Sequence, residues 1–536
     1  MLELNGEWLF KVDPEDVGLS QLWYSANFDR TDWVSVEVPG FWERYSNFSK
    51  HDGIAWYYKS FEMPKIDKRK KYAIFFGGPG GIYKPVAIVE YSEISDLLKG
   101  EFYYKKARKS EEWVKDAVIY EVFPRAFSEK GTFKEVEREI PRLKELGINV
   151  IWLMPIHPIG EVKRKGTLGS PYSVKDYFKV NPEYGTEEDF KSLVKTAHEN
   201  GIKVIIDLVI NHTAWDNDLI REHPEWYVKN NKGEIISPNS DWVDVADLNY
   251  DVQELRRYMI EVMRYWVREF DIDGYRCDVA ELVPTDFWNE ARKDLDRIKP
   301  VMMLAEGSLP EQHLEAFDLT YSWNVYDALA RIIRKGHLPS VLDNVLEGEK
   351  YKFPRGSLRL RFNENHDKPR AVKFFGEDGA LVSALIVNTI PGVPLIYNGQ
   401  EYGDTTNLSL FEKQVMSRDN SERGRKFYSF YKKLFNFRKK SLALRRGEMI
   451  KVKTSNDDKV YAFWRKYKDE TVLVVANFST WGVTTKLQVD EILRKKVKNG
   501  KVKFYDVFEE KTEEVKVEEF VNFKLEPFGF KLILIF

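Results

Sequence analysis

The feature that most constrains the fold of this chain is an alternation of short apolar runs and amphipathic segments between residues 113 and 440. The apolar runs have the length of buried strands, and the intervening segments repeat apolar residues with the spacing of a helix. Strand–helix units repeated eight times are the pattern of a (β/α)8 TIM barrel, an α/β fold. The expected strands are residues 118–124, 149–155, 204–210, 273–279, 301–306, 318–323, 358–364 and 393–399.

Two glycines mark where helices of this barrel should end. Gly147 and Gly201 each follow an amphipathic segment and come just before an apolar run. Glycine is favoured after the last turn of a helix because it adopts the left-handed conformation without a steric penalty. We therefore expect each of them to cap the helix that precedes the second or the third strand.

The barrel pattern is flanked by two regions in which short strand-like segments are separated by turns. Residues 1–110 contain short, aromatic, turn-broken segments that predict an N-terminal β-sandwich, and residues 442–536 return to strand patterns that predict a C-terminal one. The sequence thus predicts three domains, with the barrel at residues 113–440. A long connection at about 213–251, after the third strand, interrupts the repeat, and loops at this end of a barrel commonly carry binding function.

Composition excludes several classes of function. The 83 Lys and Arg residues nearly balance 85 Asp and Glu residues, for a formal charge of −2, so no basic excess indicates nucleic acid or an anionic membrane as a partner. The single cysteine excludes an internal disulfide framework. The first residues, MLELNGEWLF, lack the features of a secretory signal, and no apolar run is long enough to span a bilayer, which predicts a cytoplasmic protein.

Three carboxylates follow three of the expected strands. Asp278, Glu306 and Asp367 should therefore meet at the C-terminal rim of the barrel. A single acidic residue at a strand end is more often a helix cap, but three in order favour a site. Cleaving a glycosidic bond with retention requires two carboxyl groups about 5–5.5 Å apart, and a third can stabilise the positively charged transition state.

Strand alternation assigns the neighbours of these acids. Arg276 and Asp278 should face the same side, where the guanidinium would keep the carboxylate ionised, while Cys277 should face the helices as a packed residue. Glu306 ends an apolar run, and a carboxyl group in such surroundings should resist ionisation, as a general acid must. Asp207, at the end of the third strand, could equally hold loops together or contact a substrate.

Seven segments of the barrel region resemble signature segments of the α-amylase family, glycoside hydrolase family 13. They are VIYEVFPRAF (118–127), DLVINH (207–212), VADLN (245–249), GYRCDVAE (274–281), LAEG (304–307), NENHDKPR (363–370) and GVPLIYNGQEYG (392–403). The resemblance implies a barrel enzyme that acts on α-linked glucose polymers. It also implies a catalytic set of Asp278 as nucleophile, Glu306 as acid and base, and Asp367 as transition-state stabiliser.

The same resemblance implies five substrate-binding residues. Arg276 would hold the nucleophile, and His212 and His366 would hydrogen-bond hydroxyls of the sugar being cleaved. Tyr172 would stack under that sugar, with loop packing as its alternative. Arg370 would contact the neighbouring sugar, with a structural salt bridge as its alternative.

Departures from the family pattern concern metal binding and the acceptor side of the site. Asn211 and Asp247 match calcium-ligand positions, but the set is incomplete, so we expect no metal site and no required cofactor, with calcium left open. Many α-amylases place Lys-His where this chain has Glu281-Leu282. The DVAE segment is closer to the maltogenic amylase, neopullulanase and cyclomaltodextrinase branch.

Pieces of the first 110 residues resemble the jelly-roll sugar-binding domain of family 2 β-galactosidases. They include LNGEWLFKVDPEDVG and GGIYKPVAIVEY, and the middle of that domain is missing between Phe76 and Gly81. The resemblance implies a shortened jelly roll that packs against the barrel or a second subunit. A working carbohydrate-binding module is the alternative.

These observations predict a retaining α-glucan hydrolase that cleaves α-1,4 bonds in maltodextrins or starch. The alternatives are a 4-α-glucanotransferase and a cyclomaltodextrinase or neopullulanase type of enzyme, followed by a non-catalytic carbohydrate-binding protein of the same fold. The sequence predicts an oligo- or polysaccharide as the partner and a monomer or homodimer. It leaves open endo or exo action, chain length and 1,6 cleavage.

Overall fold

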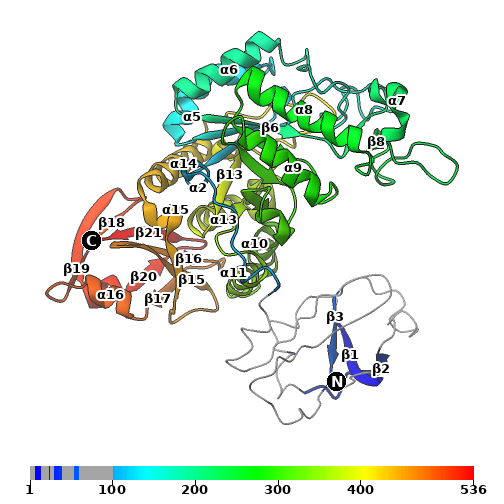
Figure 1. The fold of residues 1–536 in the computed structure, drawn as a ribbon. Coiled ribbons are helices and arrows are strands. Elements are labelled where there is room, and N and C mark those ends of the chain that lie inside the picture. Colours follow the sequence, from blue (N-terminus) through cyan, green and yellow to red (C-terminus); the bar gives the residue numbers. More distant parts are fainter. Residues whose placement is uncertain (1–5, 14–22, 24–28, 39–53, 60–99) are drawn as a thin grey trace. The chain divides into compact units, whose positions relative to one another are not determined.

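Eight parallel strands close into a barrel, and their spatial order follows their order in the chain (Figure 1). The last strand pairs with the first, which completes the ring. The predicted (β/α)8 barrel is therefore confirmed. The strands are β4 (Ile119–Val122), β5 (Val150–Leu153), β6 (Lys203–Leu208), β9 (Gly274–Cys277), β10 (Met302–Ala305), β11 (Leu319–Tyr321), β12 (Leu358–Arg361) and β13 (Val393–Tyr397). The structure is a computed structural model that describes residues 6–13, 23, 29–38, 54–59 and 100–536.

The predicted apolar runs extend past the strands at their C-terminal ends. β9 ends at Cys277, one residue before Asp278, and β10 ends at Ala305, one residue before Glu306. The acids therefore begin the loops that leave the barrel. This is the end at which barrel enzymes build their sites, because loops there vary without disturbing the strands.

Helices cover the outside of the barrel and end where the glycines predict. Helix α5 stops at Leu146, and Gly147 caps it with a φ of 106°, while its N–H bonds to the carbonyl groups of Leu143 and Lys144. Gly201 lies just beyond helix α6 (Glu187–Glu199) and has a φ of 75°. The longer helices of this layer are α5 (Ile140–Leu146), α6 (Glu187–Glu199), α8 (Gln253–Phe270), α9 (Thr285–Asp296), α10 (Trp323–Lys335), α11 (Val341–Lys352), α13 (Glu377–Thr389) and α14 (Glu422–Lys440). Shorter helices are α2 (Glu112–Lys115), α3 (Pro124–Phe127), α4 (Phe133–Arg138), α12 (Ala371–Phe375), α15 (Leu442–Arg446), η3 (Pro310–His313) and η4 (Gln400–Tyr402).

The connection after β6 is a small ribbon rather than an irregular loop. β7 (His212–Ala214) pairs antiparallel with β8 (Val245–Asp247), so that His212 lies opposite Asp247. Between them lie the short helices α7 (Leu219–Glu222) and η2 (Pro224–Trp226). The ribbon holds His212 in a fixed place beside the barrel.

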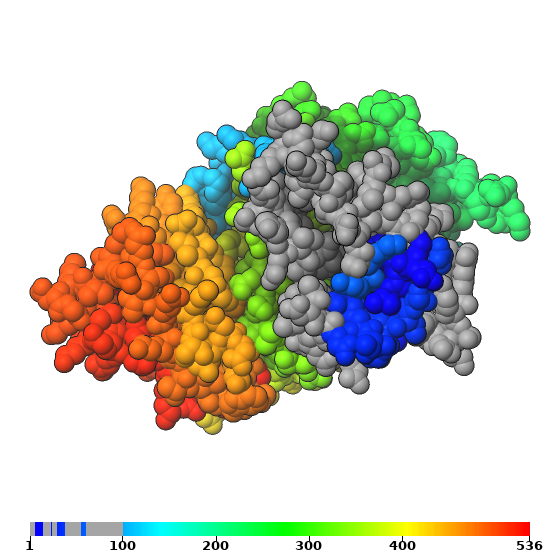
Figure 2. Space-filling model, turned by 90° about the horizontal axis from the view of Figure 1, so that it is seen from below, coloured from blue at the N-terminus to red at the C-terminus, as the bar shows by residue number. Residues whose placement is uncertain are grey.

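The C-terminal residues form an antiparallel sheet that packs against the barrel helices. Side chains of this sheet, such as Phe463 and Leu532, belong to the same buried cluster as the barrel core. The sheet lies beside α13 to α15 and is orange to red in both views (Figure 1, Figure 2). Its order is β14 (Glu448–Val452), β15 (Val460–Tyr467), β16 (Glu470–Asn477), β21 (Phe530–Ile535), β18 (Lys501–Asp506) and β19 (Lys511–Lys516).

A second pair of strands covers the other face of this sheet. β17 (Val483–Lys486) and β20 (Asn522–Leu525) pair with each other, and a second buried cluster that includes Trp464 and Phe523 fills the space between the layers. Two sheets around one apolar core agree with the predicted C-terminal β-sandwich. Two short helices, α16 (Glu491–Lys496) and α17 (Val517–Phe520), connect its strands.

The described part of the first 100 residues is a three-stranded antiparallel sheet. β1 (Gly6–Asp13) lies between β2 (Val34–Val38) and β3 (Ile54–Tyr58). The GGIYKPVAIVEY segment and the gap between Phe76 and Gly81 lie outside the described residues. The predicted jelly roll therefore stays a prediction. Within the described part of the chain, no helix has the length and apolar character needed to cross a membrane.

Candidate active site

Strand register places two of the predicted acids side by side. Ala305 pairs with Cys277 across β10 and β9, so Glu306 and Asp278 are the first residues beyond two adjacent strands. The backbone N–H of Glu306 still donates to the carbonyl of Cys277, at 3.0 Å, which extends the pairing to the acid itself. The starting points of both side chains are therefore fixed by the barrel.

Arg276 joins three carboxylates at this end of the barrel. Its Nη1 donates to Asp278 Oδ1 at 2.8 Å and to Asp207 Oδ1 at 2.9 Å. Its Nη2 lies 2.9 Å from Glu306 Oε2, an ion pair whose angle is too oblique for a hydrogen bond. Because Arg276 is fully buried, this single charge balances acids from three different strands.

Burial and the neighbouring charges act in opposite directions on the acids around Arg276. Burial raises the pKa of Asp278 well above its usual range, nearby Glu306 and Asp207 add to this, and Arg276 opposes it. Burial likewise raises the pKa of Asp207 to about 6, against the attraction of Arg276. The predicted contact of Arg276 with Asp278 is therefore present, but the guanidinium is shared among three acids and opposes only part of the effect of burial.

Glu306 also has different neighbours from those predicted. The apolar run before it suggested an apolar setting, but its Oε2 accepts a hydrogen bond of 2.8 Å from the N–H of Val279 and faces Arg276. One side of Glu306 is therefore polar, because the N–H of Val279, in the loop after β9, reaches its carboxylate. Such cross-strand neighbours are set by register and cannot be read from one segment alone.

His366 forms a second cluster with Glu121 and Asp367. Its Nδ1 lies 2.5 Å from Glu121 Oε1, and its Nε2 lies 3.3 Å from Asp367 Oδ2. Burial lowers the pKa of His366, but Asp367 and Glu121 outweigh this and raise it to about 9. The imidazole is therefore a cation at neutral pH. The Asp367 side chain is 39% exposed and is the most open of the three predicted catalytic acids.

Tyr172 connects the two clusters. Its hydroxyl donates to Asp207 Oδ2 at 3.1 Å and lies 2.8 Å from His366 Nε2. Its ring stacks on that of His366, with centroids 5.5 Å apart and an angle of 18° between planes. The structure therefore brings Tyr172, His366, Asp367 and the acids on Arg276 into one continuous network.

His212 lies at the side of this network, on the ribbon. It is buried, Asn211 Nδ2 lies 3.3 Å from its Nδ1, and the imidazole also bonds to the backbone of Tyr172. Burial lowers its pKa to about 4, so it is neutral where His366 is charged. Trp242 stands next to it, with ring centroids 5.5 Å apart.

Arg370 has the contacts of a structural residue. Its guanidinium is 3% exposed and pairs with Glu364 at 2.6 Å and with Asp404 at 2.9 Å. It also donates to the carbonyl groups of Asn398 and Thr406. These contacts favour the salt-bridge alternative and do not support the prediction that Arg370 binds a substrate.

Three residues of the network were not predicted as site residues. Asp207 pairs with Arg276, Glu121 pairs with His366, and the Tyr321 hydroxyl accepts from Arg276 Nε at 3.2 Å. Glu121 is a lone acid in the apolar strand β4, and a fully buried acid without a partner is rare. The position of an acidic residue inside an apolar strand is a signal in the sequence that could have indicated Glu121.

The loops around these residues are tied to one another. Lys165 forms an ion pair of 3.1 Å with Asp244, which links the loop after β5 to the ribbon region. The N–H of Thr167 donates to Glu412 Oε1 at 2.8 Å, which links the same loop to the one after β13. The rim is thus held by polar contacts between segments far apart in the chain.

The calcium positions suggested by the sequence carry one acidic side chain, that of Asp247. In the part of the chain that the structure describes, no three His, Cys, Asp or Glu side chains are grouped as metal ligands would be. Asn211 instead contacts His212, and burial raises the pKa of Asp247 to about 6.

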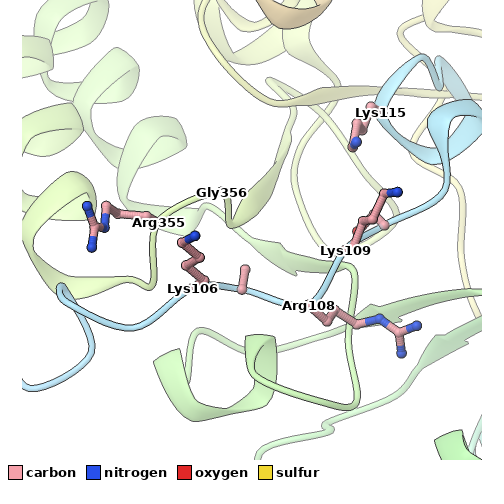
Figure 3. A pocket seen from close by; sticks show the side chains of 8 residues that line it. Lys106, Arg108, Lys109, Lys115, Arg355 and Gly356 are labelled. Atoms are coloured by element: carbon pink, nitrogen blue, oxygen red, sulfur yellow. The ribbon is translucent and has the colours of Figure 1, made fainter.

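A basic hollow of about 390 Å³ lies away from the acids (Figure 3). Lys115 precedes β4 and Gly356 precedes β12, so the hollow is at the N-terminal ends of the strands, opposite the carboxylates. It contains none of the predicted site residues. Its lining consists of Lys106, Ala107, Arg108, Lys109, Ser110, Lys115, Arg355 and Gly356.

Two family models and several solved structures match this chain. The family model described as alpha amylase, catalytic domain, matches residues 104–423, and the maltogenic amylase C-terminal domain matches residues 450–532. The solved maltogenic alpha-amylase AmyB of Thermotoga neapolitana is 36% identical with a TM-score of 0.72, over 79% of this chain and 99% of that one.

Two curated relatives extend the comparison. The cyclomaltodextrinase of Geobacillus thermopakistaniensis is 27% identical over 427 residues, which cover 71% of each chain. Alpha-amylase MalA of Haloarcula japonica is 27% identical over 396 residues, and the match spans 70% of this chain but only 57% of that protein. With the family model matching more than half of its length, this chain belongs to the alpha-amylase family of glycoside hydrolases, family 13.

Proposed function

We propose that this chain hydrolyses α-1,4-glucosidic bonds in maltodextrins and retains the anomeric configuration. The observation that carries the proposal is the contact of both Asp278 and Glu306 with the one guanidinium of Arg276. Carboxyl groups held by opposite nitrogens of a planar cation are close enough to flank a single acetal. Retaining glycosidases require two carboxyl groups about 5–5.5 Å apart, and contact with one guanidinium supports such a spacing here.

The reaction takes two displacements at the anomeric carbon. In the first, a carboxylate oxygen of Asp278 attacks this carbon while Glu306 gives its proton to the glycosidic oxygen, so that the C–O bond breaks and the chain end leaves as an alcohol. In the second, Glu306 takes a proton from water, the hydroxyl oxygen attacks the same carbon, and Asp278 leaves as a carboxylate. Two inversions at one carbon give net retention.

The role of Arg276 follows from the burial of Asp278. Burial favours the protonated form of Asp278, which cannot act as a nucleophile, and the positive charge of Arg276 opposes this effect. Arg276 also fixes the direction of the carboxylate through the 2.8 Å bond. We therefore assign Arg276 to holding the nucleophile rather than to binding the sugar directly.

The remaining residues of the network suit contact with the sugar ring. Asp367 is partly exposed beside the charged His366 and is free to stabilise the positive charge of the transition state. His366 and the neutral His212 would hydrogen-bond ring hydroxyls, and Tyr172 would stack under the ring. We do not assign Arg370 to sugar binding, because its guanidinium already pairs with Glu364 and Asp404.

The choice of substrate rests on the relatives. Their names include a cyclomaltodextrinase and a maltogenic alpha-amylase, and the C-terminal domain matches the maltogenic amylase model. We therefore propose short linear and cyclic maltodextrins as substrates. Transfer to another sugar uses the same glycosyl–enzyme and differs only in the acceptor, so a 4-α-glucanotransferase remains the alternative that the test must separate.

The experiment follows products from maltoheptaose, β-cyclodextrin and pullulan by chromatography, with the anomer released first identified by NMR. The proposal expects α-configured short products, opening of the cyclic substrate, and loss of turnover in Asp278→Asn. Asp327→Asn, an exposed residue on α10, is the matched control and should keep full activity. Products longer than the substrate would indicate the transferase, and undiminished turnover in Asp278→Asn would overturn the proposal.

A further inference from the structure

The loop after β9 contains a residue in a conformation that its side chain disfavours. Val279 has a φ of 37°, in the left-handed region that β-branched residues rarely adopt. Strain of this kind persists only where surrounding contacts enforce it, and it concentrates at functional sites. In this conformation the N–H of Val279 donates to Glu306 Oε2 at 2.8 Å.

The hydrogen-bond donor and the cation beside Glu306 act on the same oxygen. Oε2 accepts from Val279 N–H and also faces Arg276 Nη2 at 2.9 Å. An oxygen that accepts an N–H bond and lies beside a cation is the one that carries negative charge. The acidic proton of Glu306 is therefore directed to the other oxygen, Oε1.

Glu281 holds the chain on the other side of Glu306. Its Oε1 accepts a hydrogen bond from the N–H of Ser308, and the carbonyl of Ser308 in turn accepts from Lys352 Nζ at 2.9 Å. A Cβ atom on Gly307 would lie only 2.3 Å from Glu281 Cγ, so the Glu281 side chain is packed directly against the backbone after Glu306. The turn from Glu306 to Ser308 is thus fixed by a side chain from the neighbouring strand's loop.

We propose that Val279 and Glu281 are positioning residues for the general acid Glu306. Val279 selects which oxygen carries the proton, and Glu281 fixes the turn from which Glu306 extends. Neither residue touches the sugar in this assignment. The inference rests on the proposed function, because it gives Glu306 its role as acid.

A positioning role for the acid predicts a dependence on the leaving group. A glycosidic oxygen that leaves as a sugar hydroxyl needs protonation, whereas an acidic phenol leaves without it. Displacing the turn should therefore slow cleavage of maltotriose much more than cleavage of 2-chloro-4-nitrophenyl α-maltotrioside. The constant to compare is kcat/KM, which reports the first chemical step for both substrates.

The variants are Glu281→Ala, Glu281→Gln and, as a matched control, Glu290→Ala on the exposed face of α9. For Glu281→Ala we expect kcat/KM on maltotriose to fall about 10- to 100-fold, the scale of a small displacement of a catalytic group, and to fall less than about 3-fold on the phenyl substrate. Glu281→Gln keeps an oxygen for the Ser308 N–H and should stay within about 3-fold of wild type on both substrates, as should Glu290→Ala.

Equal losses on both substrates, or no loss in Glu281→Ala, would overturn the inference while leaving the proposed function intact. If Glu281→Ala does not fold, Glu281→Gln still tests the inference. A loss of kcat/KM of more than about 10-fold on maltotriose alone in this isosteric variant would contradict the role of Glu281 as hydrogen-bond acceptor for the Ser308 N–H. A wild-type protein inactive on both substrates would overturn the proposed function and this inference together.

Discussion

Replacing Arg276 by methionine tests the charge balance of the site through protein stability. The fully buried guanidinium pairs with Asp207 and Asp278 and faces Glu306, so its removal leaves several acids without a cation. Removing one partner of a buried pair costs about 3–5 kcal/mol of unfolding free energy. We expect Arg276→Met to reach that range at pH 8, where the acids would have to stay ionised.

The destabilisation caused by Arg276→Met should be smaller at low pH. The direction of this pH dependence follows from the pKa values of the buried acids. Asp207 already has a pKa of about 6 in the folded protein, above its unfolded value of about 3.9, and without Arg276 it should rise further. A group whose folded pKa is raised binds more protons when folded, so stability falls as pH rises through that interval. At pH 5 Asp207 and Asp278 should be protonated in the variant, and the loss should fall to about 1–2 kcal/mol, the value of the lost hydrogen bonds.

The assay is urea unfolding followed by tryptophan fluorescence at pH 5 and pH 8, with the midpoint converted by a common slope. Arg257→Met is the control, because Arg257 and its partner Glu254 are both more than 60% exposed and such pairs contribute at most about 1 kcal/mol. An equal destabilisation of Arg276→Met at both pH values, or one below about 1 kcal/mol at pH 8, would refute the reasoning.

Two further predictions concern the neighbours of this centre. In Glu121→Gln, His366 loses a carboxylate 2.5 Å from Nδ1, so its pKa should fall from about 9, and the alkaline limit of kcat/KM should shift to lower pH. The folded pKa of His366 lies above the unfolded value of about 6.5. The stability that His366 contributes is therefore complete below about pH 6.5 and is lost as pH rises through about 9. An unchanged pH profile of kcat/KM and of stability from about pH 6.5 to 9 in Glu121→Gln would contradict this prediction. In Arg370→Met, loss of two buried pairs should lower stability by about 3–5 kcal/mol while KM for maltotriose changes less than about 3-fold. An increase of KM above about 10-fold without loss of stability would restore a substrate role for Arg370.

The barrel could be predicted from the sequence because its signals are local and repeated. Each strand is a short apolar run, and Gly147 ends its helix for a reason that lies in the residue itself, because its φ of 106° is a conformation that glycine adopts without a steric penalty. The positions of Asp278 and Glu306 followed from the same pattern, since a residue just past a parallel strand must lie at the rim. The N-terminal prediction falls mainly outside the described residues and stays a prediction.

The surroundings of the acids could not be predicted in the same way. The pairing of Arg276 with Asp278 was predicted, but Arg276 also binds Asp207, 69 residues earlier, and the salt bridge of Arg370 depends on Asp404, 34 residues later. The φ of Val279 is enforced by tertiary contacts against its own preference, so no local pattern predicts it. Contacts of this kind depend on strand register, and only the folded chain determines them.

The claim that Asp278 forms a bond to the sugar can be tested most directly by trapping the intermediate. A 5-fluoro-α-glucosyl fluoride forms the glycosyl–enzyme quickly and releases it slowly, and peptide mass spectrometry then locates the added sugar. The account predicts one sugar per chain, on the peptide that carries Asp278, and none in Asp278→Asn. A label on any other residue, or rapid turnover with β-configured first product and no label, would contradict it.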